Sequence, residues 1–89
     1  MFTFTEAAKE EIIKRLEQQE ANHFIRLQMR KSCFMKVKLT LEAAIESNDR
    51  KIEKEGLTFI IDNGECHYFN NKKLDFIPDQ TGFKQFEVL

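Results

Sequence analysis

The alternation of hydrophobic and polar residues predicts one helix near the N-terminus, followed mainly by strands. Phe2 and Phe4 alternate with threonines, which is typical of a short strand. Thr5 then suits a helix N-cap, and Glu6 suits the positive end of a helix dipole. Apolar residues continue at helical spacing, so we expect an amphipathic helix over about residues 6–19.

From Phe24 onward the hydrophobic period changes to two. Apolar and polar residues alternate over Phe24–Met29 and again over Met35–Leu41, which predicts two half-buried strands. We expect these strands to form a hairpin with Cys33 at or near its tip. Residues 42–50 are polar and poorly patterned and predict a loop, although Leu41–Ile45 is also compatible with a helical turn.

The second half of the chain predicts further short strands separated by turn residues. Lys51–Lys54 is a candidate short strand, Gly56 marks a turn, and Leu57–Ile61 is an apolar strand. Leu74–Ile77 and Phe83–Val88 predict the final strands.

The segment Gly64–Phe69 carries two competing signals. Asn63-Gly64 is typical of a hairpin turn, which would make the segment a strand. Asp62 and Glu65 fit the spacing of a capping box, which would make it a short helix. Periodicity does not decide between them.

Composition restricts the classes of protein. With 89 residues we expect one domain, residues 1–89. Two cysteines are too few for a disulfide scaffold and make a self-contained zinc finger improbable. A net charge of −1 argues against a nucleic-acid binder. The longest apolar stretch, Leu57–Ile61, is too short to cross a membrane, and no signal peptide precedes the helix, so we expect a cytoplasmic protein.

The stretch from Ala21 to Leu41 contains no acidic residue. Its basic residues are Arg26, Arg30, Lys31, Lys36 and Lys38. Strand alternation places all of them except Lys31 on one side of the hairpin, away from the apolar residues. One interpretation is a solvated strand surface whose lysines prevent edge pairing. The other is a docking surface for an acidic protein partner or an anion. The surface has no interleaved exposed aromatics, so nucleic acid is not the expected partner.

Cys33 is the main candidate for chemistry. The positive charges of Arg30 and Lys31 would stabilise its thiolate, which favours metal ligation or nucleophilic reactivity. Its alternative role is that of a small buried apolar residue. We expect Cys66 in the core, and His67 and His23 at the surface or half-buried. No nucleophile elbow, phosphate loop or Ser/His/Asp set is present, so we expect no enzyme.

Several segments along nearly the whole chain share the order and spacing of one known family. They are Phe4–Ala8, Ile25–Leu27 through Cys33, Gly56–Asp62, Glu65–Phe69 with Leu74–Phe76, and Gly82–Phe86. Together they resemble the HesB/IscA-like, A-type iron–sulphur carriers. The resemblance implies an α+β fold with small, twisted, mainly antiparallel β-sheets of about six or seven short strands. It also implies one long N-terminal helix and a short helix at Gly64–Phe69.

The resemblance implies a role in iron–sulphur cluster biogenesis. Family carriers present one cysteine after the second strand and a C-terminal Cys-Gly-Cys. Cys33 matches the first position, Cys66 matches none, and the sequence ends at Leu89, before the place of the C-terminal pair. Cys33 is therefore the only candidate metal ligand, for iron or a cluster bound weakly, and a homodimer would supply two such thiols. The alternatives are a non-metal interaction module on the same fold and a thiol-redox protein that uses Cys33.

Overall fold

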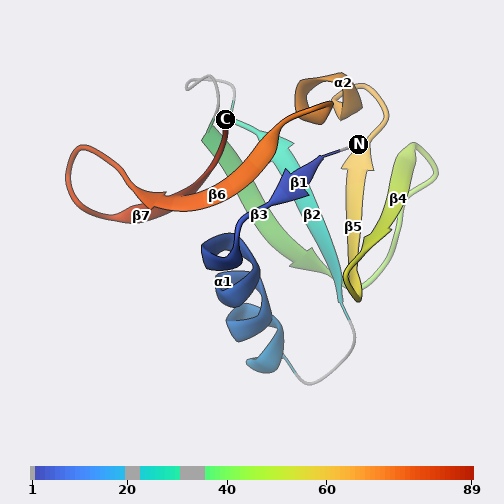
Figure 1. The fold of residues 1–89 in the computed structure, drawn as a ribbon. Coiled ribbons are helices and arrows are strands. Elements are labelled where there is room, and N and C mark those ends of the chain that lie inside the picture. Colours follow the sequence, from blue (N-terminus) through green and yellow to red (C-terminus); the bar gives the residue numbers. More distant parts are fainter. Residues whose placement is uncertain (1, 20–22, 31–35) are drawn as a thin grey trace.

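The computed structural model of the chain describes residues 2–19, 23–30 and 36–89. Its order of elements is that of an α+β protein (Figure 1). The elements are β1 (Thr3–Phe4), α1 (Glu6–Glu17), β2 (Phe24–Met29), β3 (Lys36–Glu42), β4 (Asp49–Lys54), β5 (Leu57–Asp62), α2 (Cys66–Phe69), β6 (Lys73–Pro78) and β7 (Lys84–Val88).

The strands form one mixed sheet in the order β1-β6-β7-β3-β2-β5-β4. The pairs β2–β3, β3–β7, β4–β5 and β6–β7 are antiparallel, whereas β1–β6 and β2–β5 are parallel. The expected mainly antiparallel α+β fold is therefore confirmed, with a single sheet in place of several. The sheet curls, so that β1 lies across its β2–β5 half (Figure 1). Phe2, the residue before β1, meets Phe59 on β5 edge to face, with ring centroids 5.2 Å apart.

The helix α1 begins as the sequence predicts. Thr5 Oγ1 accepts a hydrogen bond from the Ala8 backbone N–H at 3.2 Å and donates one to Asp75 Oδ1 at 2.7 Å. Thr5 therefore caps the helix and also ties it to β6. Ala8 and Ile12 are fully buried, so they anchor the apolar side of α1 in the core.

The ambiguous segment contains the short helix α2, but the predicted capping box is wrong. Asp62 Oδ1 accepts from the Gly64 N–H at 2.8 Å, which closes a local turn. The Glu65 carboxylate accepts from the backbone N–H of Met29 at 2.9 Å and so ties the start of α2 to the end of β2. The N-terminus of α2 has no side-chain cap.

The predicted loop over residues 42–50 is shorter in the structure. β3 continues to Glu42 and β4 begins at Asp49, so a helical turn over Leu41–Ile45 is wrong. The predicted turn at Gly56 is confirmed: Glu55 and Gly56 have φ values of 51° and 82°, in the left-handed region that glycine adopts at little cost.

Candidate functional site

The β2–β3 hairpin carries the residues that the sequence singled out. Its strands pair in the register Gln28↔Lys38, and the Arg30 N–H donates to the Lys36 carbonyl at 3.0 Å. The hairpin prediction is therefore confirmed. Cys33 and Lys31 fall between these strands in the sequence and lie outside the described residues, so the ligand assignment to Cys33 stays a prediction.

Three of the predicted basic residues share one side of the hairpin. Residues directly opposite in an antiparallel pair lie on the same face, which places Arg30, Lys36 and Lys38 together. Arg30 and Lys38 are exposed, Lys36 is half-buried, and none of them forms a salt bridge within the described parts of the chain. We call Arg30, Lys36 and Lys38 the basic face.

Arg26 does not belong to the basic face, and its prediction as an exposed docking residue is wrong. Its relative exposure is 6%. Its guanidinium donates to both carboxylate oxygens of Asp49, at 2.8 and 2.5 Å, and to Glu42 at 2.7 Å. These hydrogen bonds raise the pKa of Arg26 and lower the pKa of Asp49. Arg26 is therefore a neutralised structural residue that joins β2, β3 and β4.

The burial of Arg26 follows from the order of the strands. β2 and β5 lie between β3 and β4, so the connection over residues 43–48 has to cross this end of the sheet. Asp49, at the end of that connection, has a side chain only 2% exposed and also accepts from the Glu46 N–H at 2.8 Å. The connection therefore brings a buried carboxylate to Arg26.

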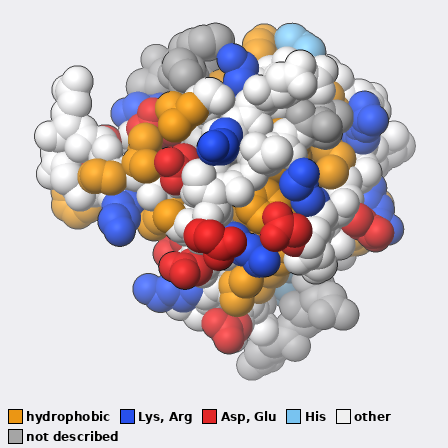
Figure 2. All heavy atoms as spheres, in the orientation of Figure 1, with side chains coloured by type: hydrophobic (Ala, Val, Ile, Leu, Met, Phe, Trp, Pro, Cys, Tyr) orange, Lys and Arg blue, Asp and Glu red, His pale blue; other side chains and the backbone are white. Residues whose placement is uncertain are grey.

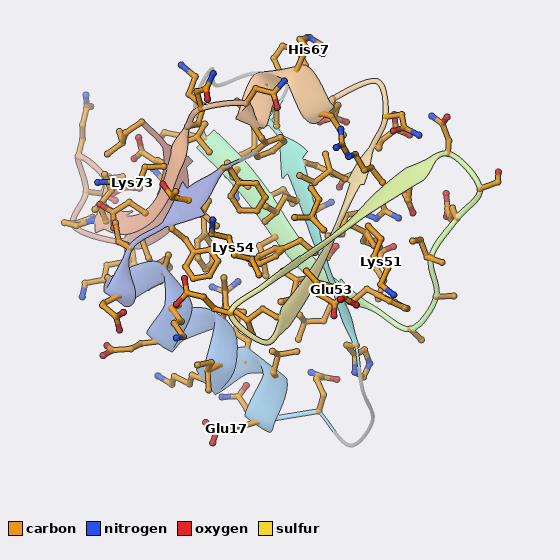
Figure 3. All side chains as sticks on the ribbon, turned by 45° about the vertical axis from the view of Figure 1, so that its right-hand side comes forward. Glu17, Lys51, Glu53, Lys54, His67 and Lys73 are labelled. Atoms are coloured by element: carbon orange, nitrogen blue, oxygen red, sulfur yellow. The ribbon has the colours of Figure 1, made fainter. Side chains whose placement is uncertain are left out.

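Cys66 lies in the core, as predicted. Its relative exposure is 8%, and its thiol donates to the Ile61 carbonyl at 3.8 Å. Burial raises the pKa of this thiol, which makes Cys66 a poor nucleophile and a poor metal ligand at neutral pH. His67 is exposed on α2 (Figure 3). Its ring lies beside that of Tyr68, with centroids 4.0 Å apart, and His23 is half-buried.

Across residues 2–19, 23–30 and 36–89, no group of three or more His, Cys, Asp or Glu side chains is arranged to hold a metal. The described helices include none that is long and apolar enough to span a membrane. Figure 2 shows basic and acidic side chains interspersed over the visible side of the molecule.

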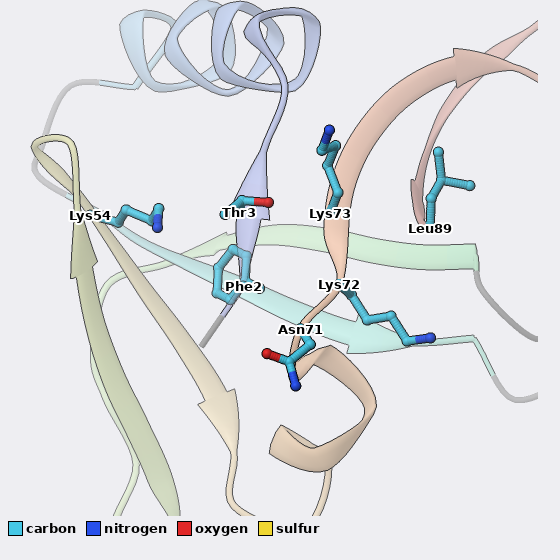
Figure 4. Close-up of a pocket in the computed structure, with 7 residues that line it drawn as sticks. All are labelled: Phe2, Thr3, Lys54, Asn71, Lys72, Lys73 and Leu89. Carbon is cyan, nitrogen blue, oxygen red and sulfur yellow. The ribbon is translucent and has the colours of Figure 1, made fainter.

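A hollow that the sequence did not predict lies between β1, the end of β4 and the start of β6 (Figure 4). Its volume is about 450 Å³. Its lining residues are Phe2, Thr3, Lys54, Asn71, Lys72, Lys73 and Leu89. They come from distant parts of the chain, and the local sequence pattern indicates none of them as a site residue. Because the parallel β1–β6 pairing was not predicted, nothing in the sequence placed Lys54 near that pair.

Residues 1–86 match the family described as "Iron-sulphur cluster biosynthesis". The chain belongs to this family. It is also 31% identical, over 86 residues, to the "Fe/S biogenesis protein NfuA" of Edwardsiella ictaluri. That match covers 92% of this chain but 45% of the relative, so the chain spans less than half of that protein's length.

Solved structures show the same fold. A protein from Aquifex aeolicus has a TM-score of 0.78 at 26% identity, covering 99% of this chain and 89% of that one. The structure of IscA with a [2Fe-2S] cluster has a TM-score of 0.67 at 22% sequence identity, and the match covers 100% of this chain and 84% of that one. Escherichia coli SufA has a TM-score of 0.69 at 17% sequence identity, and the match covers 99% of this chain and 83% of that one. The family resemblance inferred from the sequence is therefore confirmed, and the fold is IscA-like.

Proposed function

We propose that the chain acts in iron–sulphur cluster biogenesis as a non-catalytic protein that binds iron or a cluster weakly through Cys33. The family match over residues 1–86 carries this proposal. Within that match, Cys33 follows the second strand, where the family's carriers present a ligand. A reducing compartment such as the cytoplasm would keep this thiol available for a metal.

The proposal calls for more than one source of ligands. Iron–sulphur clusters are usually held by four protein ligands, and residues 1–89 offer a single matched thiolate. Cys66 is buried against Ile61 and does not add a second one. Two chains would contribute two Cys33 thiolates, and small thiols in solution would complete the coordination.

Anaerobic reconstitution with ferrous iron and sulphide tests the proposal. The chain itself provides a matched control, because it contains a second cysteine, Cys66, which is buried. We expect charge-transfer absorption in the visible range for the wild type and for Cys66→Ala, and its loss in Cys33→Ser. Absent absorption in the wild type, or equal absorption in Cys33→Ser, would overturn the ligand assignment.

A second candidate function is that of an interaction module which binds an acidic protein without using a metal. The basic face supports it, because Arg30, Lys36 and Lys38 form no salt bridge within the described residues, and only Lys36 interacts electrostatically with a carboxylate, that of Asp79. Exposed charges of one sign guide association with a surface of the opposite sign.

Charge reversal separates the two candidates. The variant Arg30→Glu with Lys36→Glu is compared with Lys14→Glu with Lys51→Glu, which changes the net charge equally at exposed positions elsewhere. If the chain is an interaction module, only Arg30→Glu with Lys36→Glu should fail to capture a partner that the wild type captures. Cys33→Ser should still capture that partner. Equal capture by both charge variants would contradict this function.

A further inference from the structure

Part of the outer edge of β3 has no strand beside it among the described residues. β7 pairs with β3 only at Lys36 and Val37, and beyond that point it turns away (Figure 1). Because the Arg30 N–H donates to the Lys36 carbonyl, Lys36 and every second residue after it bond to β2. The N–H and C=O groups of Leu39 and Leu41 therefore point away from β2, and no other described backbone group bonds to them.

We call residues 38–42 the open edge, whose sequence is Lys-Leu-Thr-Leu-Glu. Its three central side chains are uncharged and half-buried. By contrast β4, a terminal strand of the sheet, carries a charged residue at every position except Ile52. Charges on an edge strand discourage pairing with another chain, whereas an uncharged edge is open to it. The open edge of β3 is therefore better suited than β4 to pair with a further strand.

The sequence of the open edge is complementary to itself. In an antiparallel pair of two chains centred on Thr40, Leu39 of one chain lies opposite Leu41 of the other, and Lys38 lies opposite Glu42. The outward backbone groups of the two leucines then form hydrogen-bonded pairs. Thr40 faces its own copy, and each lysine faces a glutamate. Threonine pairs and pairs of opposite charge both stabilise antiparallel strands.

The charges around Glu42 favour this partner. Glu42 shares the guanidinium of Arg26 with Asp49, so this cluster holds two carboxylates and one cation. The Glu42 side chain is 34% exposed, whereas Lys38 is exposed and forms no salt bridge among the described residues. Lys38 of a second chain would neutralise the remaining negative charge. We infer that two copies of the chain associate through their open edges and join their sheets into one.

Such self-complementarity is not general in this sheet. An antiparallel pair of two β4 strands centred on Ile52 would place Lys51 opposite Glu53 but also Arg50 opposite Lys54. The second of these pairs brings like charges together and destabilises the contact. In the open edge no like charges lie opposite each other.

This inference goes beyond the proposed function, because the paired residues do not include a cysteine. The contact is therefore expected in the metal-free chain as well. A single pair of short strands makes a small interface, and small interfaces belong to weak complexes. We expect a dimer that forms reversibly at high protein concentration.

Disulfide trapping at the centre of the pair tests the inference. Residues directly opposite in a non-hydrogen-bonded pair have Cα atoms about 4.5 Å apart, which a disulfide can span. Thr40→Cys is compared with Thr58→Cys, a half-buried strand position elsewhere, both in the full chain with Cys33→Ser and Cys66→Ala. In a glutathione redox buffer only Thr40→Cys should become a covalent dimer on a non-reducing gel. Equal trapping at both positions, or none at Thr40→Cys, would overturn the inference.

Sedimentation equilibrium of the metal-free, reduced chain provides a second readout that needs no added cysteine. Lys38→Glu places like charges opposite each other at both ends of the symmetric pair and should weaken dimerisation about tenfold. Lys51→Glu makes the same change of charge at another exposed strand position and should dimerise like the wild type. A wild type that stays monomeric at millimolar concentration, or equal weakening in the two variants, would overturn the interface. Loss of the dimer in Cys33→Ser would also overturn it, because the contact would then depend on the cysteine.

Discussion

Replacing Asp49 with asparagine tests the buried ion pair that closes one end of the sheet. The side chains of Arg26 and Asp49 are 7% and 2% exposed, so the pair is shielded from solvent screening. Asp49→Asn leaves the guanidinium buried with only Glu42, whose side chain is 34% exposed, as a charged partner.

The expected loss of stability is large. Breaking a buried pair by removing one partner costs about 3–5 kcal/mol, and we expect about 3 kcal/mol because Glu42 remains bonded. For a domain of this size that loss lowers the melting temperature by about 12–24 °C. Urea denaturation followed by far-ultraviolet circular dichroism gives the free energy of unfolding directly.

The pH dependence of unfolding provides a second readout. Because the folded-state pKa of Asp49 is lowered, its contribution is fully present above the ordinary carboxyl pKa of about 3.9. The contribution is lost as the pH falls through the lower folded pKa. The difference between wild type and Asp49→Asn should therefore shrink below about pH 4.

A double variant identifies the cause of the loss. Arg26→Met with Asp49→Leu removes both charges, and apolar replacement of a buried pair is often neutral or stabilising. We expect this variant to be more stable than Asp49→Asn. A loss below about 1 kcal/mol in Asp49→Asn, or a double variant that is less stable than the single one, would refute the reasoning.

Three further predictions concern the cap, a turn and the core thiol. Thr5→Ala should lower the free energy of unfolding by about 1 kcal/mol. Thr5→Ser keeps the hydrogen bonds to Ala8 and Asp75 and should be as stable as the wild type. Equal losses of stability in the two variants would contradict the role of the Thr5 hydroxyl as a helix cap. Gly56→Ala should destabilise by about 1 kcal/mol in urea denaturation because of its φ of 82°, and an unchanged midpoint would argue against strain. Burial should protect the Cys66 thiol from alkylation until the pH is well above the ordinary cysteine pKa of about 8.5. Rapid alkylation of Cys66 at neutral pH, measured in Cys33→Ser, would contradict its burial in the core.

Local patterns in the sequence predicted the elements well. Thr5 as a helix cap, the β2–β3 hairpin, the turn at Gly56 and the burial of Cys66 all follow from short-range signals, and the structure confirms each. Such signals depend on neighbouring residues alone, so one sequence is enough to detect them.

The features that the sequence misplaced depend on contacts between distant residues. Alternation correctly put Arg26 on the polar side of β2 but did not reveal that Asp49 would cover it. The spacing of Asp62 and Glu65 imitates a capping box, yet Glu65 bonds Met29, which is 36 positions away. The hollow beside β1 likewise depends on the parallel β1–β6 pairing, which no local pattern encodes.

Mössbauer spectroscopy of the chain reconstituted anaerobically with ⁵⁷Fe tests the central claim most directly, because it distinguishes thiolate-bound iron from iron bound only by oxygen or nitrogen. Wild type and Cys66→Ala are measured beside Cys33→Ser. The account predicts a sulphur-ligated iron signal in the first two proteins and its loss in the third. The same signal in Cys33→Ser, or no sulphur-ligated iron in the wild type, would contradict a role for Cys33 in iron–sulphur cluster biogenesis.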